Sequence, residues 1–157
     1  MDEVYLKKQV NDRYSNIRFS DDCISDITEI INESGNELSF LKKFWRTLNI
    51  LDEYKDMAPI KMSKLFESLK GHSNLYSMKI KLKLNIRILY SIDKNGTILL
   101  YGFYEKGGKR ITDYNNAIPI ALERYKESKK WKTQKLWLIL FKPLPGRSEE
   151  RRVGKEC

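Results

Sequence analysis

Three lysines at alternate positions are the first residues in this chain whose spacing could support chemistry. Lys79, Lys81 and Lys83 alternate with apolar residues, so an extended strand would place three ammonium groups on one face. Arg87 lies opposite the apolar set of the next segment, where antiparallel pairing can bring it near that row. Closely packed cations can depress one another's pKa, so that a lysine can remove a proton from a hydroxyl group, whereas a planar guanidinium suits gripping a phosphate. The set is a candidate site for phosphate chemistry.

Further cations and phenols follow the same pattern along the chain. A basic sheet face can bind several phosphates, and tyrosine rings can stack on unpaired bases. Spacing alone leaves open the alternative of a lysine-rich sheet face that is merely solvated. The additional candidates are Lys106, Lys109 and Arg110 after the third predicted strand, and Tyr76, Tyr101 and Tyr104 for stacking.

The charge distribution agrees with a polyanionic partner for the second part of the chain. The formal net charge of the 157 residues is +9. Residues 1–60 hold 8 Lys/Arg against 12 Asp/Glu, whereas residues 61–110 hold 11 against 3. The basic excess therefore begins abruptly at Lys61, which is typical of a nucleic-acid-binding region. A solvated lysine-rich surface would give the same numbers.

Several other classes of site find little support in the sequence. The only histidine, His72, lies in a Gly-His-Ser loop, so neither serine–histidine nor cysteine–histidine catalysis is favoured. With Cys23 as the one credible cysteine, no metal-ligand cluster is predicted and no cofactor is expected. No window approaches the ~20 apolar residues of a membrane helix. A secretion signal is not evident at the N-terminus, and a cytoplasmic location is expected.

Three predicted strands must position the candidate residues. Period-two alternation over residues 75–84, 86–92 and 97–104 predicts half-buried strands. Asp93-Lys94-Asn95-Gly96 is a strong hairpin signal between the last two. The spacing predicts an antiparallel meander of three strands.

Flanking helices complete the expected architecture. A strand over residues 16–19 precedes a helix capped at Ser20, Asp21 or Asp22 and ended by Gly35, and Asn36 or Ser39 opens a second helix. Residues 55–59 are predicted as a loop and 63–69 as a short helical turn. A last helix is capped by Asp113 or Asn115, runs to about Lys129, and has Pro119 in its early turns. The predicted class is α+β, with an N-terminal strand and a helical hairpin packed on an antiparallel sheet and a C-terminal helix.

The predicted domain covers residues 1–130. Residues 131–146 lack clear helical periodicity and are left as an extension of uncertain origin. Residues 147–157 read RSEERRVGKEC, which resembles the conceptual translation of a short-read sequencing adapter. This tail is excluded from reasoning about the fold.

Residues 64–126 resemble the RelE/ParE toxin superfamily, nearest to its HigB-like, phage-derived branch. The similarity is carried by residues 65–71, 75–82, 86–90 and 101–106, and by Ala117, Ala121 and Arg124 of the last helix. The branch usually has a His-Gly-Phe run where this chain has Tyr101-Gly102-Phe103. The resemblance implies a RelE-like fold and a type II toxin held silent by an antitoxin, expected to be of the helix-turn-helix type.

The resemblance also implies a reaction and roles for particular residues. Ribosome-dependent members cut mRNA in the ribosomal A site without a metal, by attack of the 2′-hydroxyl on the scissile phosphate. Lys79 and Lys81 match the pair of strand lysines, the second as general base, and Arg87 matches the arginine that stabilises the transition state. Lys106 or Arg110 would match the cation near the leaving 5′-oxygen.

Two alternatives remain open from the sequence. The first is a non-enzymatic inhibitor on the same fold, like the gyrase-poisoning ParE relatives, which needs no phosphate-directed cations on the sheet. The second is a nucleic-acid-binding relative without activity. Fold alone does not decide between them.

Overall fold

The computed structural model describes residues 1–72, 74–83, 85–104 and 110–141, the last range with the side chains of 114–129 and 140. Residues Met1–Tyr125 form one compact unit, slightly shorter than the predicted domain, and Lys126–Cys157 form a second. The sheet and both hydrophobic cores belong to the first unit. The elements are α1 (Glu3–Arg13), β1 (Ile17–Phe19), α2 (Asp21–Ser34), α3 (Glu37–Tyr54), the 3-10 turn η1 (Lys55–Met57), α4 (Ala58–Lys61), β2 (Phe66–Ser68), β3 (Tyr76–Lys81), β4 (Asn85–Asp93), β5 (Gly96–Tyr104) and α5 (Arg110–Phe141).

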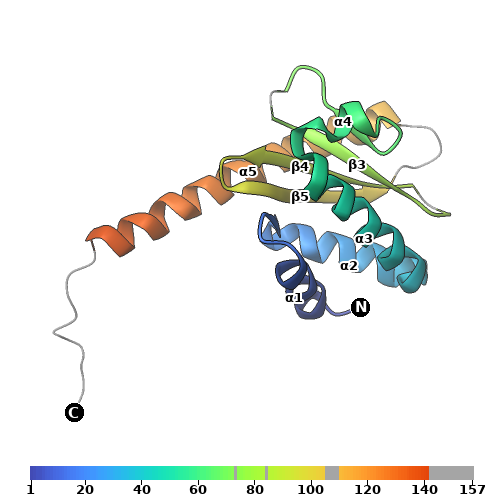
Figure 1. The fold of residues 1–157 in the computed structure, drawn as a ribbon, viewed down its shortest axis with the longest axis horizontal. Coiled ribbons are helices and arrows are strands. Elements are labelled where there is room, and N and C mark those ends of the chain that lie inside the picture. The colour runs from blue at the N-terminus through green and yellow to red at the C-terminus, as the bar shows by residue number, and fades with distance from the viewer. Residues whose placement is uncertain (73, 84, 105–109, 142–157) are drawn as a thin grey trace, which may run out of the picture. The chain divides into compact units, whose positions relative to one another are not determined.

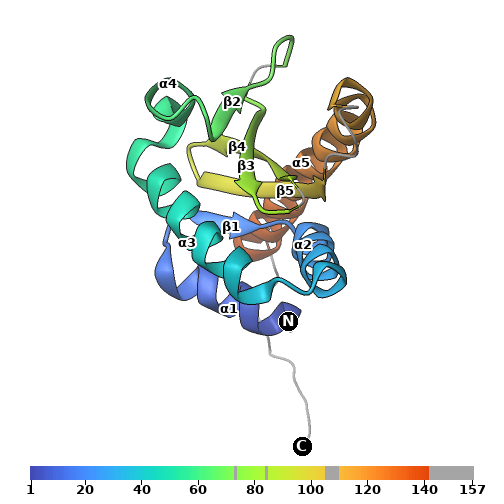
Figure 2. The ribbon, with the colours of Figure 1, turned by 90° about the vertical axis from the view of Figure 1, so that its right-hand side faces the viewer.

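A five-stranded sheet with helices on both faces forms the compact unit (Figures 1 and 2). The strand order is β1-β5-β4-β3-β2. Helices α1, α2 and α3 pack on one face over the larger core, which includes Phe40, Phe44 and Ile27. The start of α5 packs on the other face over a smaller core with Leu89, Ala117 and Ala121. The predicted α+β class is confirmed.

The sheet is mixed, although the sequence predicted an antiparallel one. The three strands of the meander are antiparallel as expected. Strand β1, however, runs parallel to β5, with Ile17 opposite Thr97 and Phe19 opposite Leu99. Turn chemistry reports only on strands that are neighbours in sequence, and β1 meets β5 across most of the domain. The wrong prediction therefore concerns the one long-range pair.

The hairpin between β4 and β5 follows its sequence signal. The backbone N–H of Asn95 donates to Asp93 Oδ1 at 2.7 Å, and Gly96 has a positive φ of 110°. A Cβ at Gly96 would lie 2.4 Å from the carbonyl oxygen of Asn16, so glycine is required where β1 approaches the turn. The N–H of Thr97 donates to the same oxygen at 2.7 Å, next to the first pair of the β1–β5 register.

The caps of α2 also match their prediction. Ser20 Oγ accepts a hydrogen bond from the N–H of Cys23 at 3.3 Å, and Gly35 ends the helix in the left-handed conformation. Cys23, Ile27 and Ile31 form its buried face. Burial raises the pKa of the Cys23 thiol, so this residue is a core side chain rather than a nucleophile.

Four helix and strand predictions are wrong. Helix α1 was missed because only Leu6 and Val10 of its 11 residues are buried, which leaves almost no periodic signal. Residues 55–61 are helical rather than a loop, and β2 lies within the predicted helical turn of residues 63–69. The predicted strand over 75–84 ends at Lys81.

The last helix is longer than predicted at both ends. Helix α5 begins at Arg110 and continues to Phe141, so Pro119 lies inside it and residues 131–141 are helical. The polar residues at 132–135 hid this continuation because they carry no apolar stripe. Among the described helices, none combines the length and apolar character needed to cross a membrane.

Candidate functional site

The register of β3, β4 and β5 brings two of the predicted cations together. Lys79 lies directly opposite Arg87, which lies opposite Phe103. Cross-strand partners share a face, and here that face is the one over which α5 packs. Ser77 and Glu67, which also pair with each other, lie two residues further along the same face. The predicted proximity of the lysine strand and Arg87 is therefore found in the structure.

Arg87 is buried within a polar cluster rather than displayed on a basic surface. Only 8% of its side chain is exposed, and Arg87 Nη1 lies 3.6 Å from Glu67 Oε1. Its guanidinium lies 5.9 Å from the centroid of the Tyr114 ring, which α5 supplies. Glu67 is more accessible, since 35% of its side chain is exposed.

Tyr114 connects this ion pair to the strand beneath it. Its hydroxyl donates to Glu67 Oε1 at 2.8 Å and lies 2.9 Å from Ser77 Oγ, which is fully buried. Since the phenol proton points to the carboxylate, the serine hydroxyl is the donor in the second bond. Burial raises the pKa of Tyr114, so it remains a donor at neutral pH. The residues of this Arg87 cluster are Arg87, Glu67, Tyr114 and Ser77.

The other two lysines of the predicted row lie beyond the cluster. Lys81 is the exposed last residue of β3, opposite Asn85, and its carbonyl oxygen accepts a hydrogen bond from Lys43 Nζ. Lys83 is exposed in the connection to β4 and is not a strand residue. The prediction that three lysines share one strand face is thus correct for Lys79 and Lys81 only.

The three tyrosines proposed for base stacking do not form one surface. Tyr101 lies on the face of Arg87. Tyr76 and Tyr104 lie on the opposite face, where Tyr76 stacks on the buried Tyr90 at 5.3 Å between ring centroids. Tyr76 and Tyr104 both pack against the larger core. A base held at Arg87 would not reach these two rings.

Three of the predicted cations cannot be placed at the cluster. Lys106 and Lys109 lie outside the described residues. Arg110 is the first residue of α5, and its side chain lies outside the described part as well. Their assigned roles remain predictions.

A second polar cluster lies at the edge of β5 that faces away from β4. Arg124 Nη1 donates to Asp26 Oδ2 at 2.5 Å and to the carbonyl oxygen of Leu100 at 2.9 Å. Its guanidinium lies 5.0 Å from the centroid of the Tyr101 ring. Burial raises the pKa of Asp26 above its ordinary value, although Arg124 opposes the shift. Arg124, Asp26 and Tyr101 form the Arg124 cluster, which joins α2, β5 and α5.

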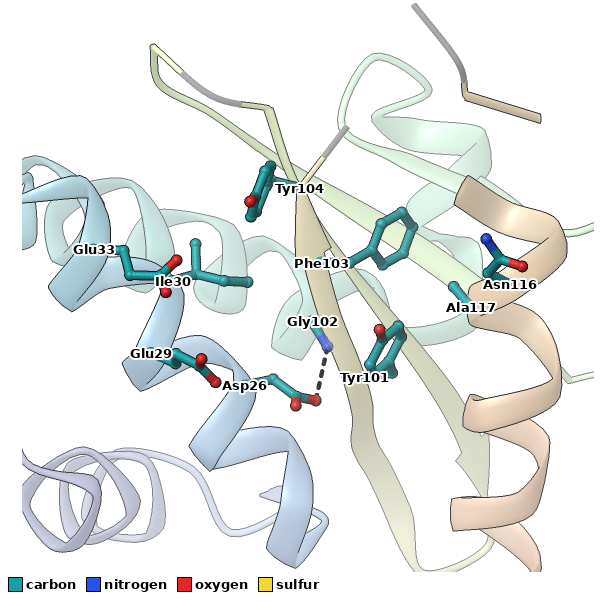
Figure 3. Close-up of a pocket in the computed structure, with 10 residues that line it drawn as sticks. All are labelled: Asp26, Glu29, Ile30, Glu33, Tyr101, Gly102, Phe103, Tyr104, Asn116 and Ala117. Carbon is teal, nitrogen blue, oxygen red and sulfur yellow. Dashed lines mark hydrogen bonds between the residues drawn. The ribbon is translucent and has the colours of Figure 1, made fainter. Parts of the chain in front are cut away.

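A groove of about 420 Å³ begins at this cluster and follows the edge of β5 (Figure 3). Helix α2 lines one side with Asp26, Glu29 and Glu33, and α5 lines the other with Asn116 and Ala117. Residues Tyr101–Tyr104 of β5 form its floor. Among the described residues that line it, three carry carboxylates and none is a lysine or arginine, which disfavours a phosphate there.

Sequence reasoning missed Glu67, Ser77 and Tyr114. Glu67 did give a signal, because it is the only carboxylate between Lys61 and Ile92 in the most basic part of the chain. Tyr114 gave none, since its role depends on where α5 crosses the sheet. Among the described residues, no group of three His, Cys, Asp or Glu side chains could hold a metal ion.

Comparisons with known proteins add no relatives. No protein-family model, curated protein or solved structure matches this chain.

Proposed function

We propose that this protein is the toxin of a type II toxin–antitoxin system and acts as a ribosome-dependent mRNA endoribonuclease. The observation that supports this most directly is the register pair Lys79–Arg87, two cations on one sheet face beside the accessible carboxylate Glu67. A protein-binding inhibitor has no need of such a set. The location follows from the same proposal, since mRNA and ribosomes are cytoplasmic.

The cluster has the groups that metal-free RNA cleavage requires. Arg87 and Lys79 would hold the scissile phosphate and stabilise the charge that develops on it. The 2′-hydroxyl would lose its proton to a base and attack the phosphorus, releasing the 5′-oxygen and leaving a 2′,3′-cyclic phosphate. Lys81 is the base that the family resemblance implies, and Glu67 is a second base that the geometry offers, 3.6 Å from Arg87.

The phosphate has to compete for Arg87 in the resting arrangement. Glu67 and Tyr114 both contact its guanidinium, and little of it is exposed. Release of Glu67 from Arg87 by an incoming phosphate would leave the carboxylate next to the ribose. Binding and base activation are thereby coupled in the proposed mechanism.

Induced expression of the full chain in a bacterium, with mRNA 5′ ends mapped, tests the proposal. We expect growth arrest and cleavage within translated codons, both lost in a Lys81→Ala/Arg87→Ala variant. The matched control is Lys94→Ala, which removes an exposed cation in the hairpin turn at the far end of β4. The thermal midpoint of each purified variant shows that loss of activity is not loss of folding.

Other outcomes would contradict the proposal. Arrest without cleavage, retained by the double variant, would favour a gyrase-type inhibitor. RNA binding by the purified chain without arrest or cleavage would favour an inactive nucleic-acid-binding relative. The base is identified separately, since a general base acts only when it is deprotonated. Whichever of Glu67→Gln and Lys81→Ala removes the base should remove the rise of the cleavage rate with pH, and the other variant should keep it.

A further inference from the structure

The sheet edge at β5 is longer than the strand that covers it. Strand β1 pairs with Thr97, Ile98 and Leu99 and ends at Phe19, whereas β5 continues to Tyr104. Immediately after β1 the chain turns into α2 at Asp21. Within the described part of the chain, no strand continues the row of β1 along residues 100–104.

Side chains rather than a strand meet the backbone at this edge. The carbonyl oxygen of Leu100 accepts hydrogen bonds from Ser20 Oγ at 3.2 Å and from Arg124. The N–H of Gly102 donates to Asp26 Oδ2 at 3.4 Å, which is long for an N–H···O bond. Since Gly102 N–H points outward, away from β4, a carbonyl oxygen of an added strand could take the place of Asp26 there.

The space beside Gly102 is the groove between α2 and α5, shown in Figure 3. The two helices cover opposite faces of the sheet, so the edge of β5 lies between them. Gly102 also lets α2 approach closely, because a Cβ there would lie 2.9 Å from Ile27 Cγ1. An added strand would continue the row of β1 and be held between the two helices.

The wall that α2 contributes is acidic in an ordered way. Asp22, Asp26, Glu29 and Glu33 recur at helical spacing and form one stripe. Arg124 contacts the first two, with its Nε 3.9 Å from Asp22 Oδ2. Glu29 and Glu33 are exposed, lie four residues apart and have no cation partner among the described residues, and this spacing of like charges costs stability.

We propose that the groove binds an extended basic segment of a partner protein, which adds a strand to β5 at Gly102. Lysine or arginine side chains at alternate positions of that segment would pair with Glu29 and Glu33, as Arg124 of this chain pairs with Asp26. The inference does not depend on the proposed ribonuclease activity, since Lys79 and Arg87 are not part of the groove.

The test uses the full chain and a blocked peptide of roughly seven alternating Lys and Val residues, which is about 24 Å long when extended at about 3.4 Å per residue. We expect binding, with the largest amide shift and slowed hydrogen exchange at Gly102 in NMR spectra. A peptide of alternating Glu and Val should not bind. A Lys–Val peptide with N-methyl groups on the amides that would face β5 should bind at least tenfold more weakly.

Matched variants separate local charge from net charge. Glu29→Gln/Glu33→Gln should weaken peptide binding about tenfold, which is what two partly exposed ion pairs contribute. Glu53→Gln/Asp56→Asn removes the same charge from exposed positions of α3 and η1 and should leave affinity unchanged.

Four results would overturn the proposal. The first is no binding of the Lys–Val peptide, and the second is equal weakening by both double variants. The third is equal binding of the N-methylated peptide. The fourth is displacement of the Lys–Val peptide by spermine at the same concentration, which would make the groove a site for small organic cations instead.

Discussion

The same three residue types meet twice in this domain, once where β2, β3 and β4 meet α5 and once at the edge of β5. The Arg87 cluster and the Arg124 cluster each combine an arginine, a carboxylate and a tyrosine ring. In the first, Arg87 Nη1 lies 3.6 Å from the carboxylate of Glu67, whereas in the second Arg124 Nη1 lies 2.5 Å from that of Asp26. Arg124 also binds the backbone of Leu100. Composition therefore does not distinguish them, and geometry does.

The two arginines differ in the carboxylate with which each of them pairs. Arg124 fastens α2, β5 and α5 together, and a ligand at its guanidinium would have to break a short ion pair. Arg87 is held by a longer ion pair with a carboxylate that water already reaches, and it lies opposite Lys79. A neighbouring cation and an accessible carboxylate suit the proposed phosphate site at Arg87, whereas a short ion pair and a backbone hydrogen bond suit a structural role for Arg124.

The largest expected effect separates the two arginines by stability. Arg124→Ala leaves the largely buried Asp26 without its cation and should lower the free energy of unfolding by about 3 kcal/mol. Arg87→Ala leaves Glu67, which can hydrate, and should cost about 1–2 kcal/mol. Urea unfolding of both variants measures the difference.

The double variant Arg124→Ala/Asp26→Asn is the control for this comparison. Removing both charges should recover part of the stability that Arg124→Ala loses, because no buried carboxylate remains unpaired. Equal costs for the two single arginine variants would contradict the structural role of Arg124.

The next effect concerns binding of single-stranded RNA. Removing Lys79 or Lys81 should reduce the slope of log affinity against log salt by about 0.7 per lost phosphate contact. Lys94→Ala, in the hairpin turn, should leave that slope unchanged. Fluorescence anisotropy of a labelled oligonucleotide over a range of salt concentrations provides the measurement. An unchanged slope for both lysine variants would show that RNA does not bind to the sheet face that carries Arg87.

The two clusters also show what a single sequence can predict. The proximity of Lys79 to Arg87 was predictable, because alternation and a short connection between β3 and β4 are local signals. The hairpin at Asn95 and the caps of α2 were predictable for the same reason. Each depends on residues within a few positions of one another.

The contacts that could not be predicted depend on long-range placement. Asp26 and Arg124 are 98 positions apart, and nothing near either residue indicates the other. Glu67 reaches Arg87 only because β2, a strand of three residues, pairs with β3. Such a short strand leaves no alternation to detect, so the carboxylate of the candidate site stayed hidden.

A smaller effect is expected for the phenol that completes the Arg87 cluster. Tyr114→Phe keeps the ring over Arg87 but removes the bonds to Glu67 and Ser77, and should cost about 1 kcal/mol of stability. Ser77→Ala removes one of the same bonds from a fully buried site. Thermal or urea unfolding of the two single variants and the double variant measures the coupling. If the hydroxyls act together, the double variant should cost less than the sum of the two, and strict additivity would show that they do not.

The smallest effect is a pH dependence that belongs to the Arg124 cluster. Burial raises the pKa of Asp26 above its ordinary value of 3.8, and Asp22 adds to this while Arg124 opposes it. The folded chain therefore holds the Asp26 proton more tightly than the unfolded chain. The stability this contributes is fully present below the ordinary value and is lost as the pH rises through the raised one.

Asp26→Asn removes this titration and leaves the other groups in place. The free energy of unfolding of the wild type, minus that of the variant, should fall as the pH rises through that window. For a single proton the slope cannot exceed about 1.4 kcal/mol per pH unit. Urea unfolding of both proteins at several pH values measures the difference. A difference that grows with pH would show that Arg124, not burial, controls Asp26, and would make this cluster a still tighter ion pair than its geometry indicates.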